Sequence, residues 1–128
     1  MVDPKDLKNI KLGEVVRLSE MLKKPAEGVC VLTPYRGRLD EDEPLSRQVN
    51  THLTAINYFG DTDGAQAFVF VSGDTVTVQA VSTPGVNIVA HHEGVPRTFK
   101  PVQCTTVARA LLTKVDSFVA SLLLGEER

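Results

Sequence analysis

Two short segments in the middle of the chain constrain its fold most, because their side chains repeat with a period of two. Ala67–Val71 and Thr75–Ala80 flank the turn sequence Ser72-Gly73-Asp74. In the second segment, valine and alanine at 76, 78 and 80 alternate with threonine and glutamine. This alternation is typical of strands that bury one face. A Gly-Asp pair between two such strands predicts a β-hairpin.

Further strand patterns lie on both sides of this hairpin. The predicted strands span 28–33, 66–72, 75–82 and 86–91, and a short last strand over 96–99 is left open. Pro34 ends the first of these strands, and Thr83-Pro84-Gly85 predicts the turn before the fourth. The pattern predicts an antiparallel meander. It leaves open whether 28–33 lies at the centre or the edge of the sheet.

Three other segments repeat with the period of a helix. The predicted helices span 4–23, 44–59 and 104–124. Asp3 is the expected N-cap of the first, and Pro4 suits the first helical position. Gly13 is a weak point at which this helix could break in two. Gly60 and Gly125 are the expected ends of the other two helices.

Together these elements give the order α-β-α-β-β-β(β)-α. The chain of 128 residues suits one domain. The predicted fold class is therefore α+β, a single domain in which an antiparallel β-meander packs against N- and C-terminal helices. This order of elements is similar to that of profilin-like and roadblock-like dimerising domains, with no shared motif.

The two cysteines are expected to be buried thiols rather than functional groups. Cys30 lies in the apolar segment Val29–Leu32, and Cys104 would lie on the apolar face of the last predicted helix. Two cysteines do not form a disulfide framework or a zinc ligand set. A single bridge or a reactive thiol is the alternative.

The middle of the sequence is unusual in its lack of cations. Between Arg47 and Arg97 there is no lysine or arginine, and the acidic residues of this stretch all fall in predicted loops (Asp61, Asp63, Asp74 and Glu93). The predicted strands therefore carry no charge, although sheets commonly protect an exposed edge with lysine or proline. The outward positions of the helix over 44–59 are also neutral (Asn50, Thr51, Thr54 and Asn57).

Two interpretations of this charge gap are open. Threonine, glutamine and asparagine can supply enough polarity, with the edges covered by other elements of the chain. Alternatively, a sheet edge or the neutral helix face contacts a second copy or another protein. The second interpretation predicts a protein-interaction module (an adaptor, chaperone or inhibitor) that self-associates as a homodimer.

The polar residues that could form a binding site fall in three places. Arg36 and Arg38 precede an acidic run, which consists of Asp40, Glu41, Asp42 and Glu43. The arginines could bind a carboxylate or phosphate, and the acids could engage a basic partner. The alternative is that arginines and acids pair locally. His52, His91 and His92 complete the candidates for a small-molecule site or enzyme pocket between sheet and helices.

The sequence predicts no catalytic residue, metal site or cofactor. The nucleophile motif G-x-S-x-G and the glycine-rich phosphate-binding motifs are missing. Neighbours such as His91 and His92 point to opposite faces of a strand, so they are poor joint metal ligands. In Asp61-Thr62-Asp63-Gly64 the glycine comes too early for a calcium loop.

Charge and hydropathy argue against two classes of partner. The net charge of −2 and the strands without cations argue against nucleic acid. The apolar runs are too short to cross a bilayer, and the N-terminus lacks the pattern of a secretory signal. The sequence therefore predicts no membrane partner and a cytoplasmic location.

Overall fold

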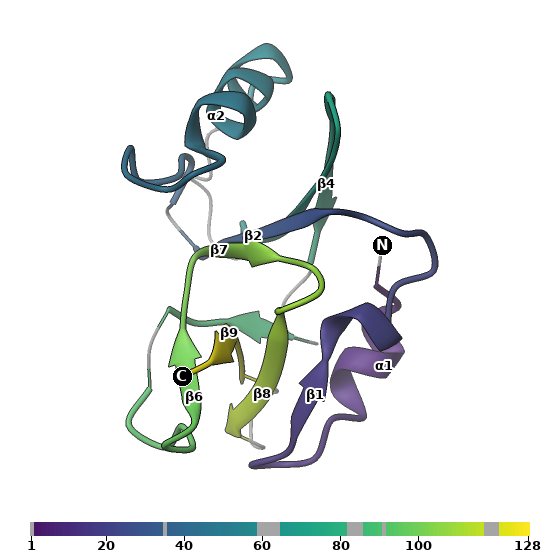
Figure 1. Ribbon diagram of the computed structural model, residues 1–128, viewed down its shortest axis with the longest axis vertical. Coiled ribbons are helices and arrows are strands. Elements are labelled where there is room, and N and C mark those ends of the chain that lie inside the picture. The colour runs from purple at the N-terminus through teal and green to yellow at the C-terminus, as the bar shows by residue number, and fades with distance from the viewer. Residues whose placement is uncertain (1, 35, 59–64, 82–85, 91, 117–120) are drawn as a thin grey trace.

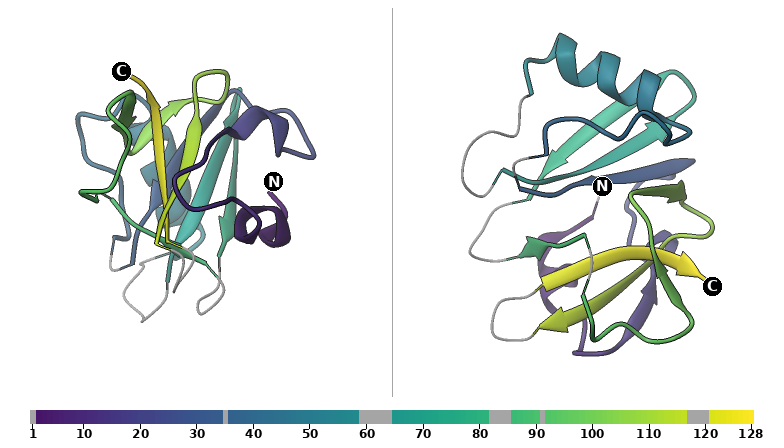
Figure 2. Two further views of the ribbon diagram at one scale, coloured as in Figure 1. Left: turned by 90° about the horizontal axis from the view of Figure 1, so that it is seen from below. Right: turned by 90° about the vertical axis from the view of Figure 1, so that its left-hand side faces the viewer.

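Two β-sheets packed face to face form the body of the protein, and one helix covers the outer face of one sheet (Figures 1 and 2). The computed structural model describes residues 2–34, 36–58, 65–81, 86–90, 92–116 and 121–128. The protein is mostly β, with two α-helices among these residues. The predicted α+β arrangement of a meander against N- and C-terminal helices is therefore wrong.

The four-stranded sheet contains the predicted hairpin. Its strands are β2 (Gly28–Leu32), β3 (Ala67–Ser72), β4 (Thr75–Ala80) and β7 (Cys104–Thr106), in the antiparallel order β4-β3-β2-β7. The hairpin prediction is confirmed. Gly73 has a φ of +57°, which the first turn residue of a two-residue type II′ hairpin requires. β2 is a central strand, because it pairs with β3 on one side and β7 on the other.

The five-stranded sheet is built from strands that are distant in the sequence. Its strands are β1 (Val15–Arg17), β5 (Asn87–Ile88), β6 (Phe99–Pro101), β8 (Leu111–Asp116) and β9 (Ser121–Glu127). Their order is β1-β8-β9-β5, and β6 also pairs with β9.

The predicted continuation of the meander into 86–91 is wrong, because β5 pairs with β9 in parallel rather than with β4. The buried Gln66 side chain fixes this crossing between the sheets. Its amide donates to the carbonyl of Val86 and accepts from the N–H of Ile88. A single glutamine before β3 gives no sequence signal for such a contact.

The predicted helix over 4–23 is reduced to one short helix, α1 (Pro4–Lys8). The cap prediction is confirmed, because the Asp3 carboxylate accepts a hydrogen bond from the N–H of Lys5. The helical period does not continue beyond Asn9. Gly13 has a φ of +80°, and the chain then enters β1 and a 3₁₀ turn, η1 (Leu18–Glu20). Pairing of β1 with β8 overrides the local helical pattern.

The predicted helix over 104–124 is wrong, because this segment forms β7, β8 and most of β9. Leu122, Leu123 and Leu124 are each 1% exposed although successive residues of a strand face opposite ways. A strand covered on both faces has a continuous apolar run, and periodicity alone cannot separate such a run from a helix face. Gly125 lies inside β9 rather than at a helix end. Without the two long helices, the similarity in element order to profilin-like and roadblock-like domains does not hold.

The middle helix exists, but it is shorter than the predicted 44–59. α2 spans Ser46–Ala55. After the C-cap residue Ile56, the chain turns at Asn57, whose φ is +59°. The N–H of Tyr58 is bonded to the carbonyl of Leu53. This is a Schellman motif in which asparagine takes the place that glycine usually fills. Gly60, the predicted end, lies outside the described residues.

Two hydrophobic clusters hold these layers together. The larger cluster lies between the sheets, where Phe68 and Phe70 of β3 pack with strand residues of the five-stranded sheet (Ile88, Leu112, Leu122 and Leu124). The smaller cluster lies between α2 and the other face of the four-stranded sheet (Cys30, Leu32, Val49, Leu53, Val69 and Val71). No helix of the described part of the chain is long and apolar enough to cross a membrane.

Candidate functional site

The outer edge of β4 presents backbone groups that have no partner among the described residues. Ser72 and Thr75 flank the two-residue turn and are paired across the hairpin. Residues in that position exchange hydrogen bonds, so alternate residues of β4 direct their backbone toward β3. The N–H and C=O groups of Val76, Val78 and Ala80 therefore point outward. Within the described ranges, no hydrogen bond joins these outward groups to another residue.

This edge lacks the features that usually prevent strand association. β4 contains no charged residue and no proline, and its six residues pair with β3 without a bulge. Thr75 and Thr77 are exposed. At the end of the strand, the Gln79 amide bonds to both backbone groups of Val2, with N···O distances of 2.9 and 2.6 Å. The free part of the edge is therefore its first four residues (75–78).

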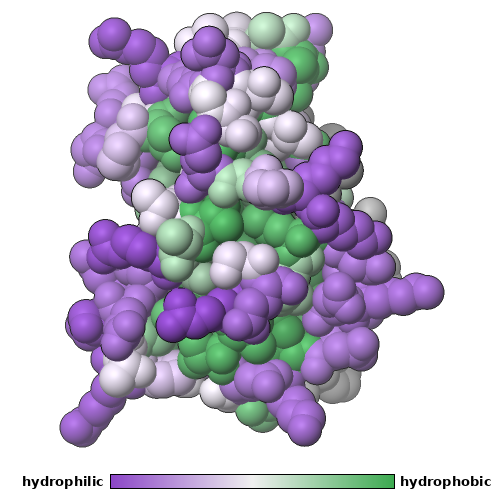
Figure 3. All heavy atoms as spheres, turned by 45° about the vertical axis from the view of Figure 1, so that its right-hand side comes forward, coloured by the Kyte–Doolittle hydropathy of each residue, from purple (hydrophilic) through white to green (hydrophobic). Residues whose placement is uncertain are grey.

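The surroundings of this edge are partly apolar. Figure 1 shows β4 at one side of the molecule, and Figure 3 turns that side toward the viewer. Hydrophobic side chains reach the surface in the middle of this face, bordered by hydrophilic ones (Figure 3). Val76 and Val78 are half-buried and pack against the cluster beneath α2.

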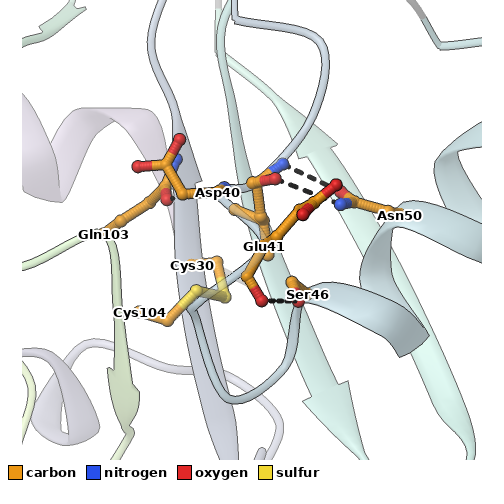
Figure 4. Close-up of a disulfide and its surroundings, with 8 residues drawn as sticks. Cys30, Asp40, Glu41, Ser46, Asn50, Gln103 and Cys104 are labelled. Carbon is orange, nitrogen blue, oxygen red and sulfur yellow. Dashed lines mark hydrogen bonds between the residues drawn. A yellow bond between two sulfur atoms is a disulfide. The ribbon is translucent and has the colours of Figure 1, made fainter.

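The opposite edge of the same sheet is fastened by a disulfide between Cys30 of β2 and Cys104 of β7 (Figure 4). The prediction of two free thiols is therefore wrong. The two cysteines are direct neighbours in the register, with a Cα–Cα distance of 4.1 Å. Such close approach belongs to antiparallel pairs that do not share backbone hydrogen bonds. The sequence could not predict the bridge, because β7 was not predicted as a strand.

A cavity of about 570 Å³ lies between the start of α2 and the four-stranded sheet. Gly28, Val71 and Cys104 contribute apolar surface, and Leu45 borders it from the helix side. The Glu126 carboxylate accepts from the Thr105 hydroxyl at 2.7 Å, and its other oxygen lies 3.5 Å from Arg109 Nη2.

This cavity lies where the sequence analysis expected a small-molecule pocket, between sheet and helix, but other residues line it. None of Arg36, Arg38, His52 and His92 is among its lining residues.

The predicted binding segment from Arg36 to Glu43 forms one loop that is fastened to α2. Arg36 Nη1 lies 2.6 Å from Asp40 Oδ1, so local pairing holds for this arginine. The Arg38 guanidinium donates to the carbonyl of Tyr58 and to the Thr54 hydroxyl, at the end of α2.

The backbone of this loop is bonded to α2, whereas most of its acidic side chains are exposed. The Asn50 amide bonds to both backbone groups of Leu39, and the Ser46 hydroxyl donates to the carbonyl of Glu41 (Figure 4). Glu41 and Asp42 are exposed, whereas Glu43 is half-buried. Partial burial, with a smaller effect of Asp42 and Asp40, raises the pKa of the Glu43 carboxyl.

The two described histidines, His52 and His92, do not share a site. His52 is half-buried on α2, and His92 is exposed, with its Nδ1 accepting from the N–H of Gly94 at 2.9 Å. His91 lies outside the described residues. In the part of the chain that is described, no three histidine, cysteine, aspartate or glutamate side chains gather as metal ligands would.

Known proteins add no further information about the site. Comparisons with protein families, with curated proteins and with solved structures find no match for this chain. Any functional inference therefore depends on the residues of this chain alone.

Proposed function

We propose that this chain is a protein-interaction module that self-associates through the outer edge of β4. The observation that supports the proposal is the set of outward backbone groups at Val76 and Val78, which have no hydrogen bond to a described residue, in an uncharged strand. Addition of a strand to an exposed sheet edge is a common mode of protein recognition, in which backbone hydrogen bonds supply affinity. An edge without charge, proline or bulge is open to this mode.

A second copy of the chain is the partner that this edge fits best. Antiparallel pairing about a two-fold axis at Thr77 places Val76 of each copy opposite Val78 of the other. Val76 of one copy and Val78 of the other then exchange hydrogen bonds through the backbone groups that point outward. Thr77 of one copy lies opposite Thr77 of the other. Such an interface is self-complementary, as two-fold symmetry requires. The strand carries no charge, so the two copies meet without like-charge repulsion.

The substitution Thr77→Lys tests this interface. Thr77 is exposed, so lysine should leave the monomer folded. In the dimer it would place two ammonium groups opposite each other at the axis, where like charges are destabilising. In sedimentation equilibrium at micromolar concentration, we expect a dimer for the wild type and a monomer for T77K.

The matched control is Thr51→Lys, at an exposed threonine on α2. It adds the same charge away from the edge, so the T51K protein should remain dimeric. Circular dichroism should show the same fold for all three proteins. A monomeric wild type, or a T77K variant that dimerises as the wild type does, would contradict the proposal.

A further inference from the structure

Three arginines from distant parts of the chain line one hollow of about 440 Å³. Arg17 lies at the end of β1, Arg109 in the turn between β7 and β8, and Arg128 directly after β9. The register of the five-stranded sheet brings them together, because Leu111 of β8 is opposite both Arg17 and Gly125. Ala108, Leu111 and Glu127 complete the lining.

Two of the three arginines in this hollow have no ion pair with a described side chain. Arg109 pairs with Glu126, which belongs to the adjacent cavity. Arg17 and Arg128 are exposed, and neither has an ion pair with any described residue. Glu127 supplies the one acidic side chain among the residues that line the hollow. Arginines that line a concave site without a carboxylate partner attract a counter-ion.

We infer that this hollow binds a small, soluble molecule that carries a phosphate group. A guanidinium presents its N–H groups as a planar fork that matches phosphate oxygens. A phosphate group would accept charge-assisted hydrogen bonds from Arg17 and Arg128, neither of which has an ion pair with a described side chain. This binding is independent of the β4 edge, which belongs to the other sheet.

The surroundings favour a compact anion over an extended one. Glu127 lies in the hollow, and Glu126 and Glu27 line the cavity that shares Arg109 with it. A nucleic acid or an anionic membrane that covered this surface would meet these carboxylates. A compact ligand can contact Arg17 and Arg128, neither of which is paired with Glu27 or Glu126.

Calorimetric titration with pyrophosphate at low ionic strength tests the inference. We expect saturable binding to the wild type and a loss of about tenfold or more in affinity for R17Q and for R128Q, since each removes a charged hydrogen-bond donor. The control is R47Q, which removes an exposed arginine of α2 and should bind as the wild type does. The variant T77K should also bind normally, so this test and that of the β4 edge can fail separately.

Two further titrations use the same proteins, with phosphatidylserine vesicles and with a short DNA duplex. We expect neither to bind in a way that depends on Arg17 and Arg128. The inference would be overturned by a wild type that does not bind pyrophosphate. It would equally be overturned by R47Q losing as much affinity as R17Q, or by vesicles or DNA binding more tightly than pyrophosphate through these arginines.

Discussion

Gly125 shows how closely the backbone of β9 approaches its neighbours. A Cβ atom at this position would collide with the Phe99 ring and lie 2.6 Å from the backbone oxygen of Lys100. Phe99 is 1% exposed, so its ring has little room to move. We expect Gly125→Ala to lower the free energy of unfolding by about 2–3 kcal/mol, as overpacking of a core does. Urea denaturation measures this loss.

Gly94→Ala is the matched control for this substitution. A Cβ there would meet only the imidazole of His92, 3.1 Å away, and that side chain is exposed and can rotate. Its stability should stay close to that of the wild type. Equal effects of the two substitutions would show that the contact with Phe99 is not tight.

The stability of the protein should depend on pH through the carboxyl group of Glu43. Burial, with the charges of Asp42 and Asp40, raises its pKa in the folded protein above the ordinary value of 4.5. The folded state therefore favours the protonated carboxyl, and stability is lost as the pH rises from the ordinary pKa through the raised one. Glu43→Gln removes this loss. We expect E43Q to melt at a higher temperature than the wild type near neutral pH, and the difference to shrink below the ordinary pKa. A constant difference across this range would argue against the raised pKa.

Individual strands could be predicted where their pattern is local. β3 and β4 alternate around a Gly-Asp turn, so their pairing follows from a few adjacent residues. β7, β8 and β9 could not be predicted in this way. In β9, Leu122, Leu123 and Leu124 are all buried, and only pairing with distant strands separates such an apolar segment from a helix. The Schellman end of α2 was missed because Asn57 gives a weaker signal than glycine.

The disulfide gives a prediction at the scale of elements, because it joins β2 to the short edge strand β7. The two cysteines are separated by 74 residues. Closing a loop of this length stabilises the folded state by about 4 kcal/mol in the chain-entropy description, and measured losses are about 2–5 kcal/mol. We expect the double variant C30A/C104A to lose stability of this order in urea denaturation.

Reduction of the disulfide in the wild type should also lower the free energy of unfolding. A thiol assay before reduction should detect no free thiol. Two free thiols in the native protein, or stability that a reductant leaves unchanged, would contradict a structural bridge.

Disulfides of this kind persist in oxidising compartments. The cytoplasmic location remains a prediction from the sequence, and the bridge favours an oxidising compartment instead.

At the scale of the whole molecule, the β4 edge and the arginine hollow differ in how far the sequence could predict them. The stretch between Arg47 and Arg97 pointed to an uncharged sheet edge, and the structure places β4 of this stretch outermost in its sheet. The arginine hollow gave no such signal. Arg17, Arg109 and Arg128 are far apart in the sequence, and only the order β1-β8-β9 makes them neighbours. The candidate residues from Arg36 to Glu43 form a single loop, and neither described histidine, His52 or His92, belongs to it.

The pairing of β1 with β8 also has a consequence for how the chain folds as it is synthesised. Val15 is opposite Thr113, and Gly28 of β2 is opposite Thr106, so both sheets contain strand pairs from the two ends of the chain. Neither sheet can be completed until the C-terminal segment has left the ribosome. The β3–β4 hairpin is local and can form much earlier, with its uncharged edge exposed. The interval between these events is when an unprotected strand most readily pairs with a neighbouring chain, so the rate of synthesis should affect the yield of correctly folded protein.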